Sequence, residues 1–213
     1  MGVEGARALV AVLPTLPRLC VLLGLSCVRD LTMRTTHGSA AAVNGLTLST
    51  NVDGYSPVVS QNPILRGCGS VKWTVDVQST GSNNGYVLLG VLGSPTPSSQ
   101  HSYQDTTCYG WISNGCVYIK GQHHCKKDGF SGFSSGDRVV LSLECSQQGN
   151  TNTATTTALT AAVSRGGARV GGGKYVLQLD SATPAWYLHV FLYHQGSRVV
   201  ICEPTADDLR ILL

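Results

Sequence analysis

The stretch Val71-Lys72-Trp73-Thr74-Val75-Asp76-Val77 alternates apolar and polar side chains along its whole length. Successive side chains of a β-strand point to opposite faces, so Trp73 and the valines share one face. Residues 138–145 repeat the alternation, with Glu144 on the polar face. The run 86–92 is apolar throughout, as expected of a strand that is covered on both faces. These stretches predict a protein built from β-strands.

The rest of the chain after residue 46 supports the same interpretation, because helical periodicity is nearly absent there. Turn dipeptides separate the apolar runs at Asp53-Gly54, Asn84-Gly85, Asn114-Gly115 and Gln195-Gly196. Further strands are expected at 46–49, 109–111, 117–119, 159–163, 175–179, 186–193 and 199–201. The polar run 147–157 and the glycine-rich run 166–174 are expected to be connectors. The sequence therefore predicts an all-β fold, an antiparallel two-sheet sandwich.

The composition argues against several classes of partner. The 213 residues carry a net charge of +3, and the longest basic run is the pair Lys126-Lys127, so nucleic-acid binding is not expected.

The eight cysteines are unevenly spaced, and a chain of this length buries enough surface to fold without disulfides. No Asn-x-Ser/Thr sequon is present. We expect an intracellular monomer in the reducing cytoplasm.

The amino-terminal segment leaves three interpretations open. Residues 8–28 are mostly apolar, but Pro14, Pro17 and Arg18 interrupt them, which disfavours a membrane span. The uninterrupted run 19–28 fits a structural helix against the main domain or the core of a secretory signal, and the surplus of arginines also fits a transit peptide. Cleavage of residues 1–28 would make the protein secreted or organellar.

Several segments, taken in order, resemble those of a SPRY domain. Residues 46–54 and 71–77 resemble its opening strands, and residues 86–91 resemble its apolar strand that ends in Gly-Val. Residues 108–118 are similar to its Tyr/Trp-Gly-Trp hairpin, and residues 133–144 to its Phe-x-x-Gly-Asp-x-Val segment. The last two strands of the family resemble 186–193 and 196–201. Thr74 and Val140 depart from the Glu and Gly that are usual in the family, which puts any subfamily assignment in doubt.

The resemblance implies a bent, concanavalin-A-like sandwich that is not an enzyme and binds partner proteins through loops at one edge. It also implies a role in recruiting substrates to a ubiquitin ligase, for which a second subunit would be needed. The domain is expected to span residues 44–205, after a 1–43 extension, with 206–213 as a tail. Matching the family's recognition edge onto this chain gives the expected partner-binding residues Tyr103, Tyr193, His194, Tyr55 and Pro57. Tyrosines suit such a surface because they add contact area at low entropic cost.

Two other kinds of function would leave a signature in the sequence. A carbohydrate-binding, lectin-like sandwich should show clustered Asp and Asn ligands for calcium, and the sequence shows no such cluster. A zinc site would draw on Cys108, Cys116, His123 and Cys125, but their spacing does not form the two short ligand pairs of structural zinc sites. Strands 109–111 and 117–119 around Asn114-Gly115, followed by an exposed polar turn at 122–128, account for the same residues. No metal and no cofactor is therefore expected.

One motif invites an enzymatic interpretation. Residues 132–136 (GFSSG) match the nucleophile elbow of some hydrolases, which requires a strand before the serine and a helix after it. Here the predicted strand 138–145 follows instead, so the motif is expected to be a turn. No paired carboxylates stand out either, and no catalytic residue is assigned.

Overall fold

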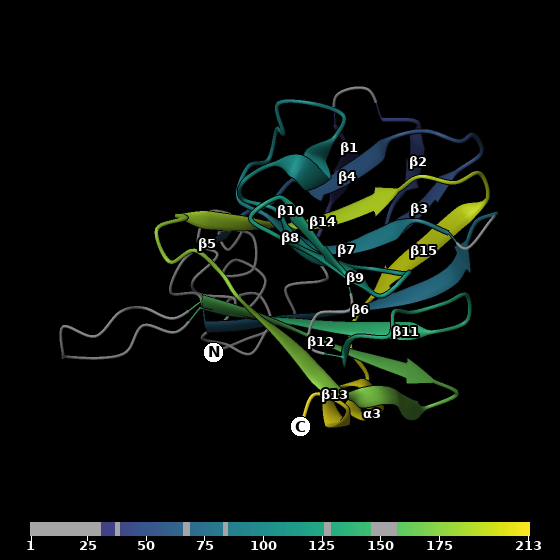
Figure 1. The fold of residues 1–213 in the computed structure, drawn as a ribbon, viewed down its shortest axis with the longest axis vertical. Coiled ribbons are helices and arrows are strands. Elements are labelled where there is room, and N and C mark those ends of the chain that lie inside the picture. Colours follow the sequence, from purple (N-terminus) through teal and green to yellow (C-terminus); the bar gives the residue numbers. More distant parts are fainter. Residues whose placement is uncertain (1–30, 37–38, 66–68, 83–84, 126–128, 146–156) are drawn as a thin grey trace, which may run out of the picture.

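The computed structural model describes residues 31–36, 39–65, 69–82, 85–125, 129–145 and 157–213. Two antiparallel sheets face each other, as Figure 1 shows. The first sheet has the order β1 (Met33–Thr35), β4 (Ser56–Ser60), β14 (Ala185–Leu192), β7 (Val87–Leu92), β8 (Tyr109–Ile112), β9 (Cys116–Ile119) and β10 (Gln122–Cys125), with β5 (Ile64–Leu65) paired to β14. The second has the order β13 (Ala168–Gln178), β12 (Thr157–Arg165), β11 (Arg138–Cys145), β6 (Gly69–Thr80), β15 (Ser197–Cys202), β3 (Thr47–Thr50) and β2 (Ala41–Asn44). The predicted two-sheet sandwich is confirmed.

The alternating strands place their apolar faces between the sheets. In β6, Val71, Trp73, Val75 and Val77 are buried, and the β11 partners of the first three are buried with them: Leu141 lies opposite Trp73. Cross-strand pairs of this kind stabilise a sheet through side-chain contact as well as through burial. All residues of β7 are buried, which confirms the interpretation of its continuous apolar run.

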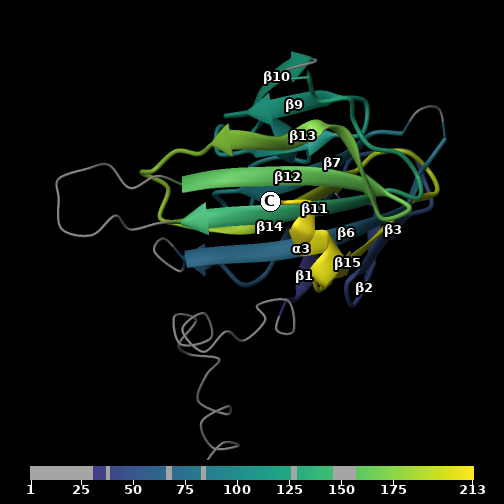
Figure 2. The same cartoon turned by 90° about the horizontal axis from the view of Figure 1, so that it is seen from below.

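In the described part of the chain, two short helical elements accompany the strands. The 3-10 helix η2 (Ser102–Gln104) belongs to the long segment between β7 and β8, and helix α3 (Ala206–Arg210) follows β15. Figure 2 shows α3 against the outer face of the second sheet. No helix among the described residues is long and apolar enough to cross a membrane.

The elements near both ends of the chain differ from the expected division. Strand β1 and all but the last residue of β2 lie inside the expected extension 1–43, and the two strands pair with β4 and β3. Residues 206–210, expected to be part of a tail, form α3. The apolar run 19–28, for which a helix was one interpretation, lies outside the described residues.

Two expected loops are strands over part of their length. His123 and His124 lie in β10 rather than in a polar turn, because Lys120 and Gly121 both have positive φ, at 52° and 71°, and close a tight two-residue hairpin from β9. The glycine-rich connector is also shorter than expected, since β13 begins at Ala168. The Gly132–Gly136 stretch does lead into strand β11, as the sequence predicted for a turn.

Candidate binding surface

Tyrosines gather at one end of the first sheet because of its antiparallel order. Tyr55 directly precedes β4, Tyr193 directly follows β14, and Tyr86 directly precedes β7. Since β14 lies between β4 and β7 and runs opposite to both, these positions meet at the same end of the sheet. The Tyr55 and Tyr193 ring centroids lie 5.4 Å apart, and those of Tyr86 and Tyr193 lie 6.3 Å apart.

Tyr103 reaches the same place from the segment between β7 and β8. Its ring lies 5.0 Å from Phe191 and 5.3 Å from Tyr118, both on the outer face of the first sheet.

Gly90 and Gly110 lie opposite each other in the middle of this sheet, in the same cross-strand row as Tyr118. A Cβ at Gly90 would come within 2.0 Å of the Tyr109 carbonyl oxygen, so only glycine fits there.

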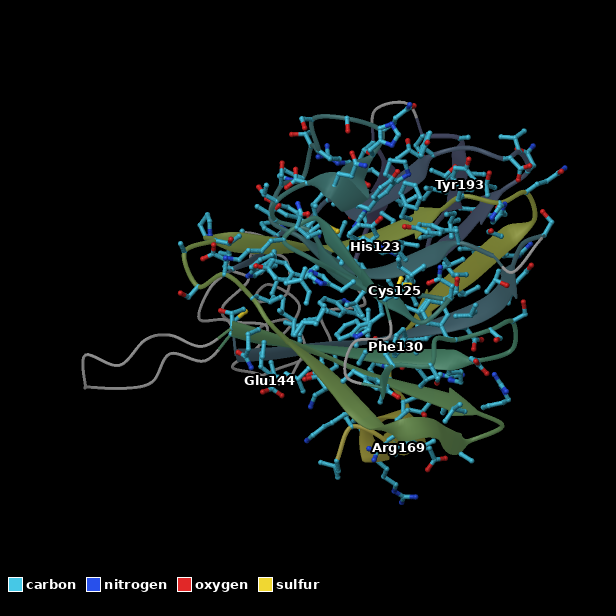
Figure 3. All side chains as sticks on the ribbon, viewed as in Figure 1. His123, Cys125, Phe130, Glu144, Arg169 and Tyr193 are labelled. Carbon is cyan, nitrogen blue, oxygen red and sulfur yellow. The ribbon has the colours of Figure 1, made fainter. Side chains whose placement is uncertain are left out.

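We call Tyr55, Tyr86, Tyr103, Tyr118 and Tyr193 the tyrosine cluster. Tyr118 is buried and the other rings are partly buried, packed against a small apolar cluster on the outer face of the sheet. Figure 3 shows Tyr193 at this end of the molecule. The rings thus combine a fixed position with partial exposure, which is the state in which an aromatic side chain contacts a partner at low entropic cost.

Two hydroxyl groups of the cluster bond to each other, and a third bonds to a neighbouring histidine. Tyr86 donates to the Tyr118 hydroxyl at 3.0 Å, and the Tyr103 hydroxyl lies 2.9 Å from His101 Nδ1. Burial, and then the hydrogen bond to Tyr118, raises the pKa of Tyr86 well above its usual value. Burial and the neighbouring Tyr55 raise the pKa of Tyr103 to about 12. The Tyr86 and Tyr103 hydroxyls are therefore uncharged at neutral pH and lie beside apolar ring faces.

A buried histidine holds the segment between β7 and β8, which we call the covering segment, on the outer face of the first sheet. His189 of β14 lies 2.9 Å through Nε2 from the Ser102 hydroxyl of η2, and its Nδ1 lies 3.7 Å from Cys108 Sγ. All three side chains are at most 1% exposed. Burial lowers the pKa of His189 to about 4, which Asp105 only partly opposes. This Ser-His pair is sealed from solvent, so it positions η2 and thereby Tyr103.

The structure brings together three of the five residues expected to bind a partner, namely Tyr55, Tyr103 and Tyr193. His194 adjoins them, with its ring 5.0 Å from that of Tyr193 and its Nδ1 3.5 Å from Asp53. Pro57 does not join them, because it is buried inside β4 opposite Phe191.

Sequence reasoning missed two members of the cluster, Tyr86 and Tyr118. An aromatic residue directly before the apolar run 87–92 is a local signal that could have identified Tyr86. Tyr118 joins the cluster through its register with Gly110, and no local pattern reports that register.

Part of the cysteine- and histidine-rich stretch converges as well. Cys116, His123 and Cys125 are the one group of three or more His, Cys, Asp or Glu side chains in the described part of the chain whose ligand atoms converge, all within 4.8 Å of one another. Cys108, the other candidate, is buried beside His189 instead.

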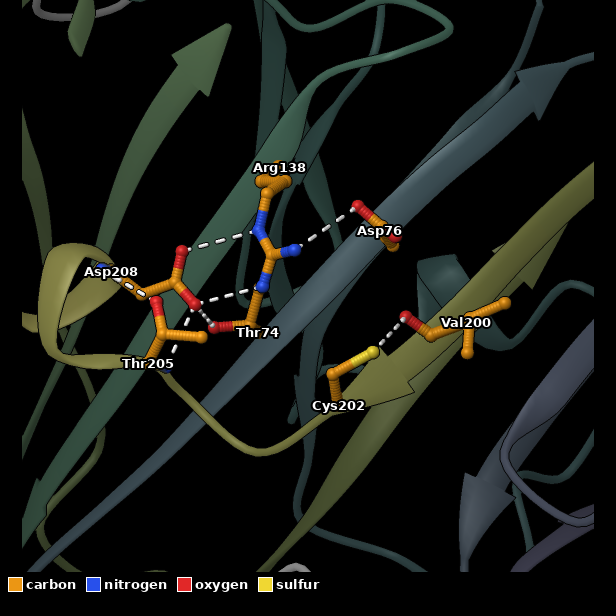
Figure 4. Close-up of polar contacts among 7 residues, drawn as sticks. All are labelled: Thr74, Asp76, Arg138, Val200, Cys202, Thr205 and Asp208. Carbon is orange, nitrogen blue, oxygen red and sulfur yellow. Dashed lines mark hydrogen bonds and ion pairs between the residues drawn. The ribbon is translucent and has the colours of Figure 1, made fainter. Parts of the chain in front are cut away.

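The outer face of the second sheet is closed by the chain itself. Leu212 packs on Val140 and Ala162 beyond α3. Asp208 of α3 accepts hydrogen bonds from Arg138 at 2.8 Å and from the Thr74 hydroxyl at 3.1 Å, as Figure 4 shows. With its polar groups paired and its apolar residues covered, this part of the face leaves little for a partner.

Comparisons with solved structures identify the fold class as the bent β-sandwich of SPRY domains. The SPRY domain of human HERC1 matches at 18% identity with a TM-score of 0.56, over 78% of this chain and 93% of that chain. A second human SPRY domain matches at 17% identity with a TM-score of 0.52, over 78% of this chain and 98% of that chain. No family model and no curated protein sequence matches the chain. The protein therefore has a SPRY-like fold, as its ordered motifs indicated.

Proposed function

We propose that this protein is a non-catalytic interaction module that binds a segment of a partner protein on the tyrosine cluster. The observation that carries the proposal is the convergence of partly exposed rings from separate parts of the chain onto one end of one sheet. Large aromatic side chains with fixed positions dominate the affinity of many interfaces. The SPRY-like fold supports a protein as the ligand.

The chemistry of the cluster indicates what kind of segment fits it. Neutral tyrosine hydroxyls and ring faces favour a partner that offers apolar side chains together with backbone or side-chain hydrogen-bonding groups. Asp53 and His194 border the cluster and offer a place for a polar residue of the partner at the rim. Affinity then comes from the rings, and the rim adjusts specificity.

The residues that resemble catalytic machinery support a role without catalysis. The Ser102–His189 pair is buried between η2 and the first sheet, where no substrate reaches it. Ser134 lies in a turn that leads into β11, without the helix that a nucleophile elbow requires. Substrate recruitment for a ubiquitin ligase is the specific role that we propose for the module, with the catalytic subunit supplied by another chain.

Affinity capture from cells tests the proposal. We expect Tyr103→Ala and Tyr193→Ala each to lose partners that the unaltered protein retains, because each removes a ring from the centre of the cluster. Once a partner segment is defined, either substitution should weaken its binding by about 30-fold, equivalent to about 2 kcal/mol at a binding hot spot. Val176→Ala, which alters a 43% exposed side chain on β13 of the other sheet, is the matched control and should change nothing.

Identical partner lists for the unaltered protein and both tyrosine variants would refute the proposed surface. The recruitment role has its own readout: ligase subunits should be captured together with the substrate. Capture of substrates alone, with no ligase subunit in any sample, would refute the recruitment role and leave the binding surface standing.

A further inference from the structure

The hairpin of β9 and β10 places sulfur and imidazole ligands on one face. Cys116 and Cys125 are directly opposite in the register of the two strands. His123 lies two residues before Cys125 on β10, and alternate residues of a strand share a face. Figure 3 shows His123 and Cys125 on this hairpin. Cys116 is 7% exposed and forms the floor, while His123 and Cys125 are exposed.

We propose that Cys116, His123 and Cys125 bind a thiophilic divalent metal ion, with Zn²⁺ as the best match, and that water supplies the fourth ligand. The inference is independent of the function proposed for the tyrosine cluster. Two cysteines and one histidine form a ligand set that zinc accepts, and zinc sites with three protein ligands keep a position for water.

The distances fit the proposal after a small side-chain movement. Cys116 Sγ lies 2.7 Å from Cys125 Sγ, and both ring nitrogens of His123 lie 3.9 Å from Cys125 Sγ. With zinc–sulfur bonds of about 2.3 Å and zinc–nitrogen bonds of about 2.0 Å, tetrahedral geometry sets sulfur–sulfur separations near 3.8 Å and sulfur–nitrogen separations near 3.5 Å. The sulfurs must move apart by about 1 Å, which rotation of the exposed Cys125 side chain permits.

The strand geometry also selects these three residues from the richer stretch around them. His124 lies opposite Val117, on the other face of the hairpin, and is not available to the same ion. The ring of His123 lies 5.3 Å from that of Tyr118, its register partner, and this contact holds the imidazole over the hairpin. A pre-positioned ligand loses less freedom when a metal binds.

Metal binding at this site requires the cysteines to act as thiolates. Each thiol that coordinates the ion releases one proton, so two cysteines release up to two protons for each ion bound. The bound ion would join the edge strand β10 to β9 and stabilise the hairpin.

Cobalt(II) titration of the purified full chain, kept reduced with a phosphine that has no thiol, tests the site. We expect sulfur-to-cobalt charge-transfer absorption that saturates with one bound equivalent, together with a visible band typical of tetrahedral cobalt, and displacement of both by Zn²⁺. Cys125→Ser and His123→Ala should each weaken binding at least about tenfold, since each removes a ligand. His124→Ala and Cys202→Ser remove the same residue types away from the site and should bind as the unaltered protein does.

Circular dichroism of every variant establishes that the fold is retained, which the exposure of His123 and Cys125 favours. Absence of the charge-transfer band, or a band of unchanged strength in both ligand variants, would overturn the proposal. So would a chain that remains metal-free under these conditions and loses two hydrogens by mass in a Cys125-dependent way, since the pair would then form a disulfide rather than a metal site.

Discussion

The outer faces of the two sheets are covered in different ways. On the first sheet, the segment between β7 and β8 lies over the face and leaves tyrosine rings partly exposed around it. On the second sheet, α3 and Leu212 cover the face, and the carboxylate of Asp208 is fully engaged by side chains of β6 and β11. One face is closed by the chain's own end, whereas the other presents amphipathic side chains.

In this sandwich, the outer face of the second sheet serves the stability of the fold, whereas the outer face of the first sheet is the one expected to bind a partner. A buried charge is tolerated only where it is paired and hydrogen-bonded, and such a pairing fixes the position of α3. A tyrosine hydroxyl carries no charge and therefore needs fewer hydrogen bonds than a carboxylate when it is partly buried. Tyrosine side chains can therefore stay at a boundary between protein and water. The partner surface is therefore expected where the polar groups are neutral and partly exposed.

The largest effect is expected at the closed face. Asp208→Ala should lower the free energy of unfolding by roughly 3–5 kcal/mol, because it leaves Arg138 without its bidentate partner. Burial alone raises the pKa of Asp208, but hydrogen bonds from Thr205 and Arg138 outweigh it and leave that pKa below its usual value. Asp208→Ala also removes the capping box of α3 with Thr205. Urea denaturation measures the change.

Asp207→Ala is the control, because Asp207 is the neighbouring residue and its side chain is 79% exposed beside Arg210. Its removal should change the free energy of unfolding by no more than about 0.5 kcal/mol. Equal effects of the two substitutions would show that the network around Asp208 does not close the second face.

A smaller effect is expected at the outer face of the first sheet, where burial keeps the His189 imidazole uncharged. Its pKa is lowered by burial to about 4 in the folded protein, against about 6.5 in an unfolded chain. Between these values the unfolded chain binds a proton that the folded protein does not, so the free energy of unfolding falls as the pH falls. The contribution is fully present above pH 6.5 and is lost towards pH 4, by roughly 3 kcal/mol in all.

Denaturation curves between pH 7 and pH 4 measure this loss. His189→Asn should flatten the pH dependence in that window even though it is less stable at pH 7. His124→Ala, which alters an exposed histidine, should keep the slope of the unaltered protein. A slope that survives in His189→Asn would assign the acid sensitivity to another group.

The elements that the sequence predicted well are those whose pattern is fixed by the core. Strands β6 and β11 alternate because one face of each packs in the core between the sheets, and their observed bounds include the expected ones. Strand β10 was missed because all four of its residues are exposed, so no apolar period marks it. Strands β1 and β2 are short edge strands and α3 is a single short helix, so each carries too few residues to show a period.

The candidate site was only partly accessible from the sequence. The family resemblance supplied Tyr55, Tyr103 and Tyr193, and the structure places them together. Tyr118 joins through cross-strand register, which depends on distant strands and leaves no local signal. The metal ligands show the same limit: spacing along the chain argued against zinc, whereas pairing across the hairpin brings Cys116 to Cys125.

The smallest effect is expected from the loss of a single hydroxyl group on the outer face of the first sheet. Tyr86→Phe keeps the ring but removes the hydrogen bond to Tyr118, so the free energy of unfolding should fall by about 1 kcal/mol. Tyr187→Phe, on a partly buried tyrosine of the same sheet face, is the matched control and should cost less. Because the Tyr86 hydroxyl bonds within the cluster, its loss should disturb ring positions less than removal of a ring, and partner binding should weaken less than in Tyr103→Ala. A Tyr86→Phe variant that binds partners as poorly as Tyr103→Ala would mean that the hydroxyl network, rather than the rings, forms the recognition surface.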